Sequence, residues 1–297
     1  MPPSVLALFG PTGVGKTALA HALADRLRTQ GRRPVAVSAD ALQVYAGLER
    51  LTGAADAADR ARLEHRLVGV VPVRESFSAG AYAARAHAEI DELLAEGATP
   101  IVVGGTGLYL RAALADLDLR PAVDPALRAH WQAVLDAEGP RALHEALTQR
   151  DPELAALTQP TDAHRLVRAL ELLDAGQAPP RPGASQLWTT ETRHPTRLIG
   201  LTMERAALDA AIDARVDAML SAGVVGEVRA AAAAGASETA RKALGFRELL
   251  DGDVDLMKQR TRRYARRQLT WMRKLPAVEL VDVTGRDAAE VAVALLP

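Results

Sequence analysis

Short apolar runs alternate with longer segments of helical pattern over the first 115 residues. Uninterrupted runs of this length are typical of strands buried in a parallel sheet, whereas apolar residues at three- and four-residue spacing indicate helices with one buried face. The predicted strands are 5–9, 34–40, 67–73 and 100–103. The predicted helices are 18–27, 78–96 and 108–115, and 47–62 is predicted as loop with a short helix. This alternation predicts an α/β fold with a parallel sheet.

The alternation stops after residue 120 and returns near residue 196. In between, the apolar pattern is helical until the Pro-rich segment 179–183, which can only be loop. The helices predicted there are 125–137, 141–149, 152–157 and 162–175. The rest of the chain is predicted to hold strands 196–201 and 278–281 and helices 205–221, 225–234, 240–250, 254–274 and 288–296. We therefore expect a core formed by residues 1–120 and 184–297, with an all-helical insertion over 121–183.

A phosphate-binding pattern directly follows the first predicted strand. Residues 10–17 have the sequence G-x-x-x-x-G-K-T of a P-loop, between a buried strand and a helix as this motif requires. The backbone N–H groups of such a loop point at an anion, and the following helix adds its positive dipole end. Lys16 adds a charge, and Thr17 offers a hydroxyl to a phosphate-bound Mg²⁺. The residues predicted to bind phosphate are Gly10, Pro11, Thr12, Gly13, Val14, Gly15, Lys16 and Thr17.

Two further polar residues follow predicted strands. Ligands of open parallel sheets bind beyond the carboxyl ends of the strands, so Asp40 and Thr106 are expected near the P-loop. Asp40 is predicted to be a general base or a Mg²⁺ ligand, with a helix N-cap as the alternative. Thr106 follows two glycines and either holds a phosphate oxygen or belongs to a tight turn. The strand 100–103 ends in glycine rather than an acidic residue, which speaks against a nucleoside triphosphatase without excluding a kinase.

Composition narrows the possible functions. The chain has no cysteine, which excludes disulfides, cysteine-ligated zinc and thiol catalysis. The net charge is −1, so affinity for nucleic acid must come from local patches. We find no basic-then-apolar leader and no apolar run of about 18 residues, and we therefore expect a cytoplasmic protein that does not bind membranes. No protein partner is implied.

One predicted helix carries most of the local positive charge. Residues 258–274 contain eight Lys and Arg side chains and no acidic residue. This concentration favours a polyanion such as RNA, with a solvated face balanced by acidic neighbours as the alternative. Arg165 and Arg168 could likewise clamp phosphate or pair with Glu171. Arg215 lies among acidic residues at helical spacing, which ion pairs along one helix would explain.

Together, these motifs resemble the tRNA dimethylallyltransferases, also called tRNA isopentenyltransferases. The resemblance covers most of the chain, and its most specific part is the run Thr-Arg-Arg-Tyr-Ala-Arg-Arg-Gln-Leu-Thr-Trp at 261–271. The other segments that carry it are 10–17, 38–47, 101–109, 124–128, 162–171 and 243–248. It implies a P-loop NTPase-like core that transfers a dimethylallyl group from dimethylallyl diphosphate to N6 of adenosine 37 in tRNA. The P-loop would then bind diphosphate rather than ATP, and the helical insertion would clamp the anticodon stem-loop.

The resemblance also implies residue roles. Asp40 would take the proton of the attacking amine, and Gln43 would help to recognise the target adenine. The implied catalytic set is Asp40, Thr106, Lys16 and Arg215, of which the last three stabilise the departing diphosphate together with Mg²⁺ on Thr17. The implied tRNA-binding set is Asp40, Ala41, Leu42, Gln43, Thr106, Arg128, His164, Arg165, Arg168, Lys242, Gly245, Arg247, Arg266, Arg267 and Arg273.

The sequence departs from the family pattern at three places. Ala41 stands where the family commonly has serine, the segment 51–55 lacks the usual lysine, and 72–82 keeps little of the usual pattern. Three alternatives stay open: the same transfer to a free adenine nucleotide, as in adenylate isopentenyltransferases; a P-loop small-molecule kinase; and an RNA-binding protein without catalysis. The long insertion and the basic helix favour tRNA over a free nucleotide.

Overall fold

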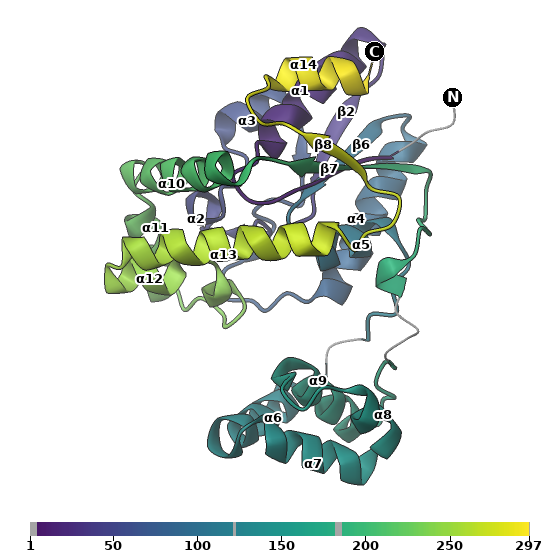
Figure 1. Cartoon of the computed structure of the whole chain (residues 1–297), viewed down its shortest axis with the longest axis vertical. Helices are drawn as coiled ribbons and strands as arrows, with labels where there is room; N and C mark the ends of the chain where they lie inside the picture. Colours follow the sequence, from purple (N-terminus) through teal and green to yellow (C-terminus); the bar gives the residue numbers. More distant parts are fainter. Residues whose placement is uncertain (1–4, 121–122, 182–185, 297) are drawn as a thin grey trace. The chain divides into compact units, whose positions relative to one another are not determined.

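The main sheet is assembled from the short apolar runs of the sequence. The computed structural model describes residues 5–120, 123–181 and 186–296. Within these ranges the main sheet has six strands, all parallel, in the order β4-β2-β6-β1-β7-β8 (Figure 1). The strands are β1 (Val5–Phe9), β2 (Pro34–Ser38), β4 (His65–Arg66), β6 (Thr99–Gly104), β7 (Thr196–Thr202) and β8 (Glu279–Asp282). Every residue of β1 and β2 is buried, as the continuous apolar runs predict for central strands covered on both faces.

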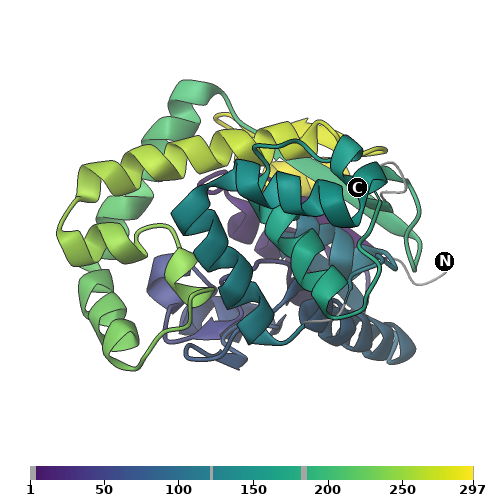
Figure 2. The same ribbon diagram turned by 90° about the horizontal axis from the view of Figure 1, so that it is seen from below.

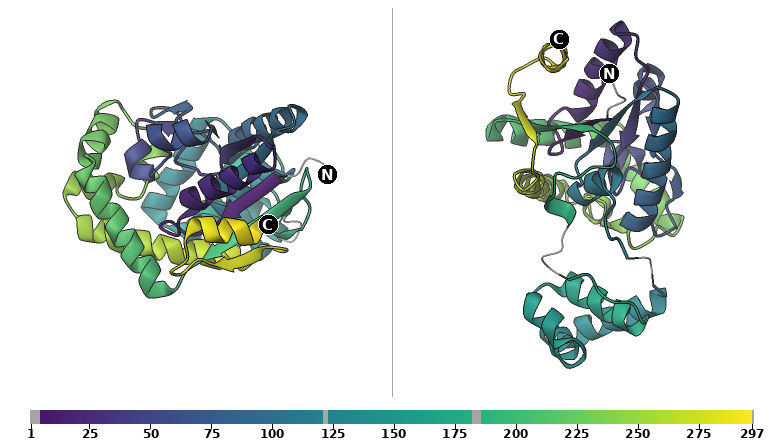
Figure 3. Two further views of the ribbon diagram at one scale, coloured as in Figure 1. Left: turned by 90° about the horizontal axis from the view of Figure 1, so that it is seen from above. Right: turned by 90° about the vertical axis from the view of Figure 1, so that its right-hand side faces the viewer.

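Helices cover both faces of this sheet. Helices α1 and α14 lie side by side on one face, and α4 and α5 pack on the other (Figures 1 and 3). Their bounds are α1 (Lys16–Thr29), α4 (Ala79–Ala95), α5 (Gly107–Leu114) and α14 (Ala288–Leu295), with α2 (Glu49–Thr52) and α3 (Ala57–Arg62) in the connection after β2. The buried core between α1 and the sheet contains Leu8, Leu23, Leu27 and Ile101. The core is therefore aliphatic, and it fixes the start of α1 against the end of β1.

A helical layer follows β7. It consists of α10 (Arg205–Ser221), α11 (Val224–Ala233), the short 3-10 helix η2 (Ala240–Lys242), α12 (Phe246–Asp251) and α13 (Val254–Met272). Helix α13 packs against α10 and α12 (Figures 1 and 2). It also contacts α5 in the first unit. None of the helices in the described ranges is both long and apolar enough to cross a membrane.

The chain divides into two compact units. The first comprises residues up to 116 and from 190 onward, and the second comprises residues 117–189. The second unit contains α6 (Pro125–Glu138), α7 (Pro140–Arg150), α8 (Pro152–Leu157), α9 (Ala163–Asp174) and the 3-10 helix η1 (Gln186–Trp188). Its own core contains Leu143, Leu147, Leu166 and Leu170, so this unit buries its apolar faces internally.

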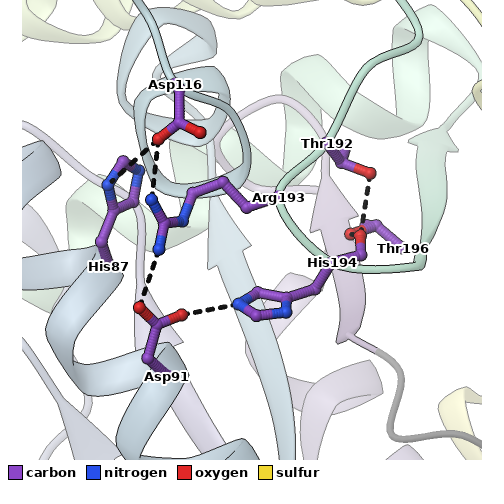
Figure 4. A network of polar contacts seen from close by, with 7 residues as sticks. All are labelled: His87, Asp91, Asp116, Thr192, Arg193, His194 and Thr196. Atoms are coloured by element: carbon purple, nitrogen blue, oxygen red, sulfur yellow. Dashed lines mark hydrogen bonds and ion pairs between the residues drawn. The ribbon is translucent and has the colours of Figure 1, made fainter.

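A polar network in the first unit joins the two points where the chain leaves and returns (Figure 4). Arg193 donates to Asp116 and to Asp91 of α4, both at 2.7 Å. His194 lies 2.6 Å from the other oxygen of Asp91. The two connections to the second unit are thus held together on α4.

Two predicted elements are wrong. The run 67–73 is not one strand, because Leu67 (φ 61°) and Gly69 (φ 64°) adopt left-handed conformations that turn the chain. Only β4, just before it, joins the main sheet, while β5 (Val71–Pro72) pairs with β3 (Tyr45–Ala46) in a separate two-stranded sheet. The predicted helix 240–250 is interrupted by Gly245 (φ 93°) and becomes η2 and α12. The pattern of apolar residues alone does not predict either turn.

Candidate active site

The P-loop connects the end of β1 to the start of α1. Gly13 (φ 84°) and Gly15 (φ 92°) have left-handed backbone angles that other residues rarely adopt, which explains why glycine occupies both positions. The Nζ of Lys16 donates hydrogen bonds to the carbonyl oxygens of Gly10 and Pro11, both at 2.9 Å. The lysine is therefore folded over its own loop.

The environment of Lys16 lowers its pKa to about 8. Burial is the largest cause, the positive charge of Arg215 adds to it, and the negative charge of Asp40 opposes it. Two cations and one carboxylate thus lie close enough to influence one another. An anionic ligand between the two cations would restore the balance of charge.

Asp40 lies two residues after the end of β2. Its Oδ1 accepts hydrogen bonds from the backbone N–H of Leu42 (2.9 Å) and of Gln43 (3.4 Å), so the carboxylate caps the turn after the strand. Among the described residues, no hydrogen bond reaches its Oδ2. The side chain also lines the main cavity of the first unit. Capping and proton transfer are therefore compatible, because each uses a different oxygen.

The segment after α2 orients two predicted site residues. Gln43 accepts a hydrogen bond from Ser38 Oγ (2.9 Å) and donates one to the carbonyl oxygen of Gly53 (3.2 Å). Arg215 donates to the carbonyl oxygen of Thr52 (3.1 Å). A Cβ on Gly53 would lie 1.8 Å from the guanidinium of Arg215, so only glycine leaves room for this arginine. Arg215 thus reaches the cavity instead of pairing along its own helix.

The loop after β6 brings Thr106 to the same cavity. Its Oγ1 lies 3.4 Å from the hydroxyl of Tyr264 on α13. Burial, with a smaller contribution from the charge of Asp40, raises the pKa of Tyr264 to about 12, so this hydroxyl stays protonated and able to donate. A Cβ on Gly104 would lie 2.1 Å from the carbonyl oxygen of Ala39, which shows that this glycine allows the ends of β2 and β6 to approach.

These segments enclose a cavity of about 600 Å³ in the first unit. The predicted site residues that line it are Thr12, Gly13, Gly15, Lys16, Thr17, Asp40, Ala41, Leu42, Gln43, Thr106, Arg215, Lys242 and Arg267. Part of its wall is apolar and consists of Leu51, Val216, Met219, Leu244 and Met257. The cavity therefore offers phosphate-binding groups and an apolar surface to the same ligand.

A second, basic cavity of about 420 Å³ shares residues with the first. The cations that line it are Arg241, Lys242, Arg247, Arg260, Arg263 and Arg267, of which Lys242 and Arg267 also line the main cavity. Arg260 pairs with the buried carboxylate of Glu248. No ion pair within the described ranges engages Lys242, Arg247 or Arg263. This surplus of positive charge next to the main cavity suits a polyanion.

Comparison with known proteins identifies the family. The model of the IPP transferase family matches residues 43–275. A tRNA dimethylallyltransferase from Kineococcus radiotolerans is 40% identical, and the alignment covers 97% of this chain and 94% of that protein. Another from Thermobifida fusca is 39% identical over 99% of this chain and 94% of its own length. The chain belongs to the IPP transferase family. This is a family of prenyltransferases, that is, of enzymes.

Solved structures agree with this assignment. The full-length tRNA isopentenylpyrophosphate transferase from Bacillus halodurans is 32% identical and has a TM-score of 0.70, with 99% of this chain and 94% of that chain covered. A eukaryotic dimethylallyltransferase described as acting on tRNA has a TM-score of 0.78 at 24% identity, with 98% and 78% covered, and it supports the fold alone. The predicted P-loop-like parallel core with flanking helices is confirmed.

Some cations of the basic helix are balanced by acidic side chains and others are not. Lys258 pairs with Asp217 (2.6 Å), Arg262 pairs with Asp213, and Arg260 pairs with Glu248, as expected for a charge-balanced face. Arg266 and Arg273 are exposed and, in the described part of the chain, have no acidic partner. The charge-balanced interpretation therefore holds for Lys258, Arg260 and Arg262. The interpretation of the helix as an RNA-binding surface stays a prediction for Arg266 and Arg273.

Two arginines of the second unit are engaged by one buried carboxylate. Arg128 binds both oxygens of Glu171 at 2.9 and 2.8 Å, and Arg168 binds one of them at 2.6 Å. The Glu171 side chain is fully buried. Arg165 is exposed and lies 3.3 Å from Asp162, and His164 is exposed beside it. The structure thus realises the pairing alternative for Arg168, and it gives Arg128 a structural contact that the sequence did not suggest.

Two residues of the cavity wall were given no role by the sequence. Tyr264 and Gln268 line the main cavity from α13. Gln268 is a polar residue on the buried face of a basic helix, and this was the one signal that could have singled it out.

The donor set for a metal is small. In the described part of the chain, no group of three or more His, Asp or Glu side chains could hold a metal ion. Thr17 is exposed and lines the cavity, so its hydroxyl is accessible. This set fits a cation such as Mg²⁺, which keeps several waters and binds mainly through substrate phosphates.

Proposed function

We propose that this chain transfers the dimethylallyl group of dimethylallyl diphosphate to N6 of adenosine 37 in tRNA and releases diphosphate. One observation carries the proposal: a single cavity joins the P-loop, Asp40, Thr106 and Arg215, and it shares Lys242 and Arg267 with a basic cavity. The first part suits an allylic diphosphate, because anionic and apolar halves of that substrate meet matching walls. The second part suits the backbone of a polynucleotide.

The chemistry follows from the side chains in the cavity. The adenine N6 forms a bond to C1 of the dimethylallyl group, and the bond from C1 to the diphosphate oxygen breaks, with the electron pair leaving on that oxygen. The N6 proton goes to Asp40, whose Oδ2 is not needed by the turn. Lys16, Arg215 and Thr106 stabilise the charge that develops on the diphosphate, together with the N–H groups of the P-loop. The hydroxyl of Tyr264 lies within hydrogen-bond distance of the Thr106 hydroxyl and orients it.

Mg²⁺ is the cofactor that fits. Thr17 would hold it together with diphosphate oxygens and water, and it would neutralise part of the charge on the leaving group. The protein's own contribution is to keep Lys16 and Arg215 on the same diphosphate, because both line the cavity.

The tRNA side of the proposal rests on unpaired charge. Lys242, Arg247 and Arg263 surround the basic cavity, and no ion pair within the described ranges occupies them. Extruding a base from its stack costs a few kcal/mol, which several phosphate contacts offset. A free adenine nucleotide would leave most of these cations unused, and a small-molecule kinase would not need them.

The decisive experiment supplies dimethylallyl diphosphate, Mg²⁺ and a tRNA with adenosine at positions 36, 37 and 38. Mass spectrometry should detect one prenylated adenosine at position 37. Parallel reactions contain AMP instead of tRNA, or ATP alone. Product from AMP but not from tRNA would favour the free-nucleotide reaction, and loss of the γ-phosphate of ATP without prenylation would favour a kinase. RNA binding without any turnover would favour an RNA-binding protein without catalysis.

A further inference from the structure

A single buried amide connects three segments of the proposed diphosphate site. Gln268 lies on α13 with 5% of its surface exposed. Its Oε1 accepts the backbone N–H of Thr12 in the P-loop at 2.9 Å, and its Nε2 donates to the carbonyl oxygen of Gly105 at 2.7 Å. Gly105 immediately precedes Thr106 in the loop after β6. The P-loop, the Thr106 loop and α13 therefore meet at one side chain.

The two hydrogen bonds fix the chemical identity of this residue. The Thr12 N–H can only donate and the Gly105 carbonyl can only accept, so the bridge needs an acceptor and a donor on one planar group. A glutamate of the same size would place an oxygen against the Gly105 carbonyl and a negative charge beside the diphosphate. A leucine would leave the Gly105 carbonyl and the Thr12 N–H without this partner.

The partner loop is shaped to this amide. A Cβ on Gly105 would lie 2.3 Å from Nε2 of Gln268, while the next nearest atom, the carbonyl oxygen of Gly10, would be 3.3 Å away. The backbone of Gly105 does not have a left-handed φ, so the amide of Gln268 is the main obstacle to alanine there, and the Gly10 carbonyl oxygen would have to move by only a few tenths of an ångström. The absence of a side chain at Gly105 is thus explained by the position of the glutamine.

The helix that carries Gln268 also carries residues of the tRNA side. Arg267 lines both cavities, and Tyr264, one turn earlier, contacts Thr106. A shift of α13 would therefore move the polynucleotide-facing cations and the diphosphate loops relative to each other unless something ties them together. Gln268 supplies that tie from the buried face of the same helix.

We propose that Gln268 is a positioning residue, which holds the diphosphate loop, the Thr106 loop and α13 in register so that the acceptor amine meets the dimethylallyl carbon. This inference rests on the proposed function. A residue that positions the reacting groups without binding tRNA affects the rate and not the affinity. Misplacement of reacting groups by about 1 Å costs on the order of a hundredfold in rate. Gln268→Leu and Gln268→Glu should therefore lower kcat about a hundredfold while the KM for tRNA stays within about twofold of the parent value. Gln268→Glu should in addition weaken binding of inorganic diphosphate.

A double-mutant cycle tests the bridge directly. Gly105→Ala alone should impair turnover, because its methyl group displaces the amide of Gln268. In a Gln268→Ala background the same change should cost much less, since the amide nitrogen at 2.3 Å is gone and only the 3.3 Å approach to the Gly10 carbonyl oxygen remains. Gly107→Ala is the matched control: its Cβ would lie 2.1 Å from the Trp271 ring on the same helix, so its effect should persist in the Gln268→Ala background.

The outcomes are distinct. The proposal is overturned if Gln268→Leu keeps at least a third of the parent kcat at a temperature where thermal unfolding shows it folded. It is also overturned if the effects of Gly105→Ala and Gln268→Ala on log kcat simply add. If the parent protein prenylates no RNA, the proposed function fails; binding of inorganic diphosphate by the parent and the Gly105 and Gln268 variants then still reports whether the bridge shapes the P-loop.

Discussion

Replacement of Asp40 by asparagine separates two roles that one carboxylate combines. Its Oδ1 accepts the N–H groups of Leu42 and Gln43 at 2.9 and 3.4 Å, and the amide oxygen of asparagine can accept the same bonds. The turn after β2 should therefore keep its shape. The lost properties are the negative charge and the ability to take a proton from the adenine amine.

The structure allows the two effects to be compared in magnitude. Loss of a general base costs about 10²- to 10⁴-fold in rate, or about 3–5 kcal/mol in the activation barrier. The asparagine retains the capping bonds, so we expect the free energy of unfolding to change by less than about 0.5 kcal/mol, whereas Asp40→Ala should lose about 1 kcal/mol with the cap. Activity should thus collapse in a protein of nearly unchanged stability.

The same substitution should affect diphosphate binding in the opposite direction to its effect on the rate. The charge of Asp40 raises the pKa of Lys16 against the effect of burial, and it also lies near the site of an anionic ligand. Removal of the carboxylate removes its repulsion of the diphosphate, but it also lowers the pKa of Lys16, so the comparison belongs at pH 6, well below the pKa of about 8. At pH 6 Asp40→Asn should bind inorganic diphosphate at least as tightly as the parent does.

Single-turnover prenylation at saturating tRNA, calorimetric binding of diphosphate and thermal unfolding together test this reasoning. Asp282→Asn is the matched control, because Asp282 ends β8 and its Oδ1 accepts the N–H of Thr284 at 2.9 Å in the same kind of turn. The base assignment is refuted if Asp40→Asn keeps more than a tenth of the parent rate. A comparable loss in Asp282→Asn would show that the effect is not specific to the cavity.

Three further predictions concern binding, geometry and stability. Because the pKa of Lys16 is about 8 in the free protein, diphosphate affinity should fall by up to about tenfold per pH unit above pH 8, and a Lys16→Arg variant should show a flatter calorimetric profile; an equally steep profile would contradict this. Gly53→Ala should displace Arg215 and lower kcat at least about tenfold, whereas Gly31→Ala, with a similar positive φ of 72° but nothing within 4 Å, should cost stability only. Glu171→Gln should destabilise the second unit by about 2–3 kcal/mol, which is less than the loss of a fully buried pair would cost because the two arginines are partly exposed. Hydrogen exchange in α6 and α9 should accelerate, and unchanged exchange would show that the pairing is dispensable.

The parts of the site that were predictable are those where one segment carries both the structural and the chemical signal. The P-loop is contiguous, and Asp40 and Thr106 each lie two residues after the last residue of a strand, β2 and β6 respectively. Since these strands are adjacent and parallel, their carboxyl ends must lie together, and the rule for ligands in such sheets places both residues at one edge. The two residues converge on one site because β2 and β6 are neighbours in the strand order.

The parts that were not predictable depend on contacts between distant segments. Leu67 has a left-handed backbone although it is not glycine, and nothing in an apolar run announces that. The amide of Gln268 faces partners 256 and 163 residues away in the sequence. Arg215 is positioned by Gly53, which belongs to the segment 51–55 that departs from the family pattern, and no local spacing rule connects these two residues.

The charge of the second unit shows why counting arginines is insufficient. Arg128 and Glu171 are 43 residues apart, so no local spacing rule could pair them. A guanidinium has five N–H donors, and Arg128 uses Nε and Nη2 on the buried carboxylate while its side chain remains 46% exposed. Its Nη1 still carries two donors that this pair does not use. We infer that the ion pair orients Arg128 and leaves its Nη1 available for a further hydrogen bond. A phosphate could bind this remaining edge of the guanidinium while the pair with Glu171 stays intact. The phosphate would then bind an arginine whose rotamer is already fixed.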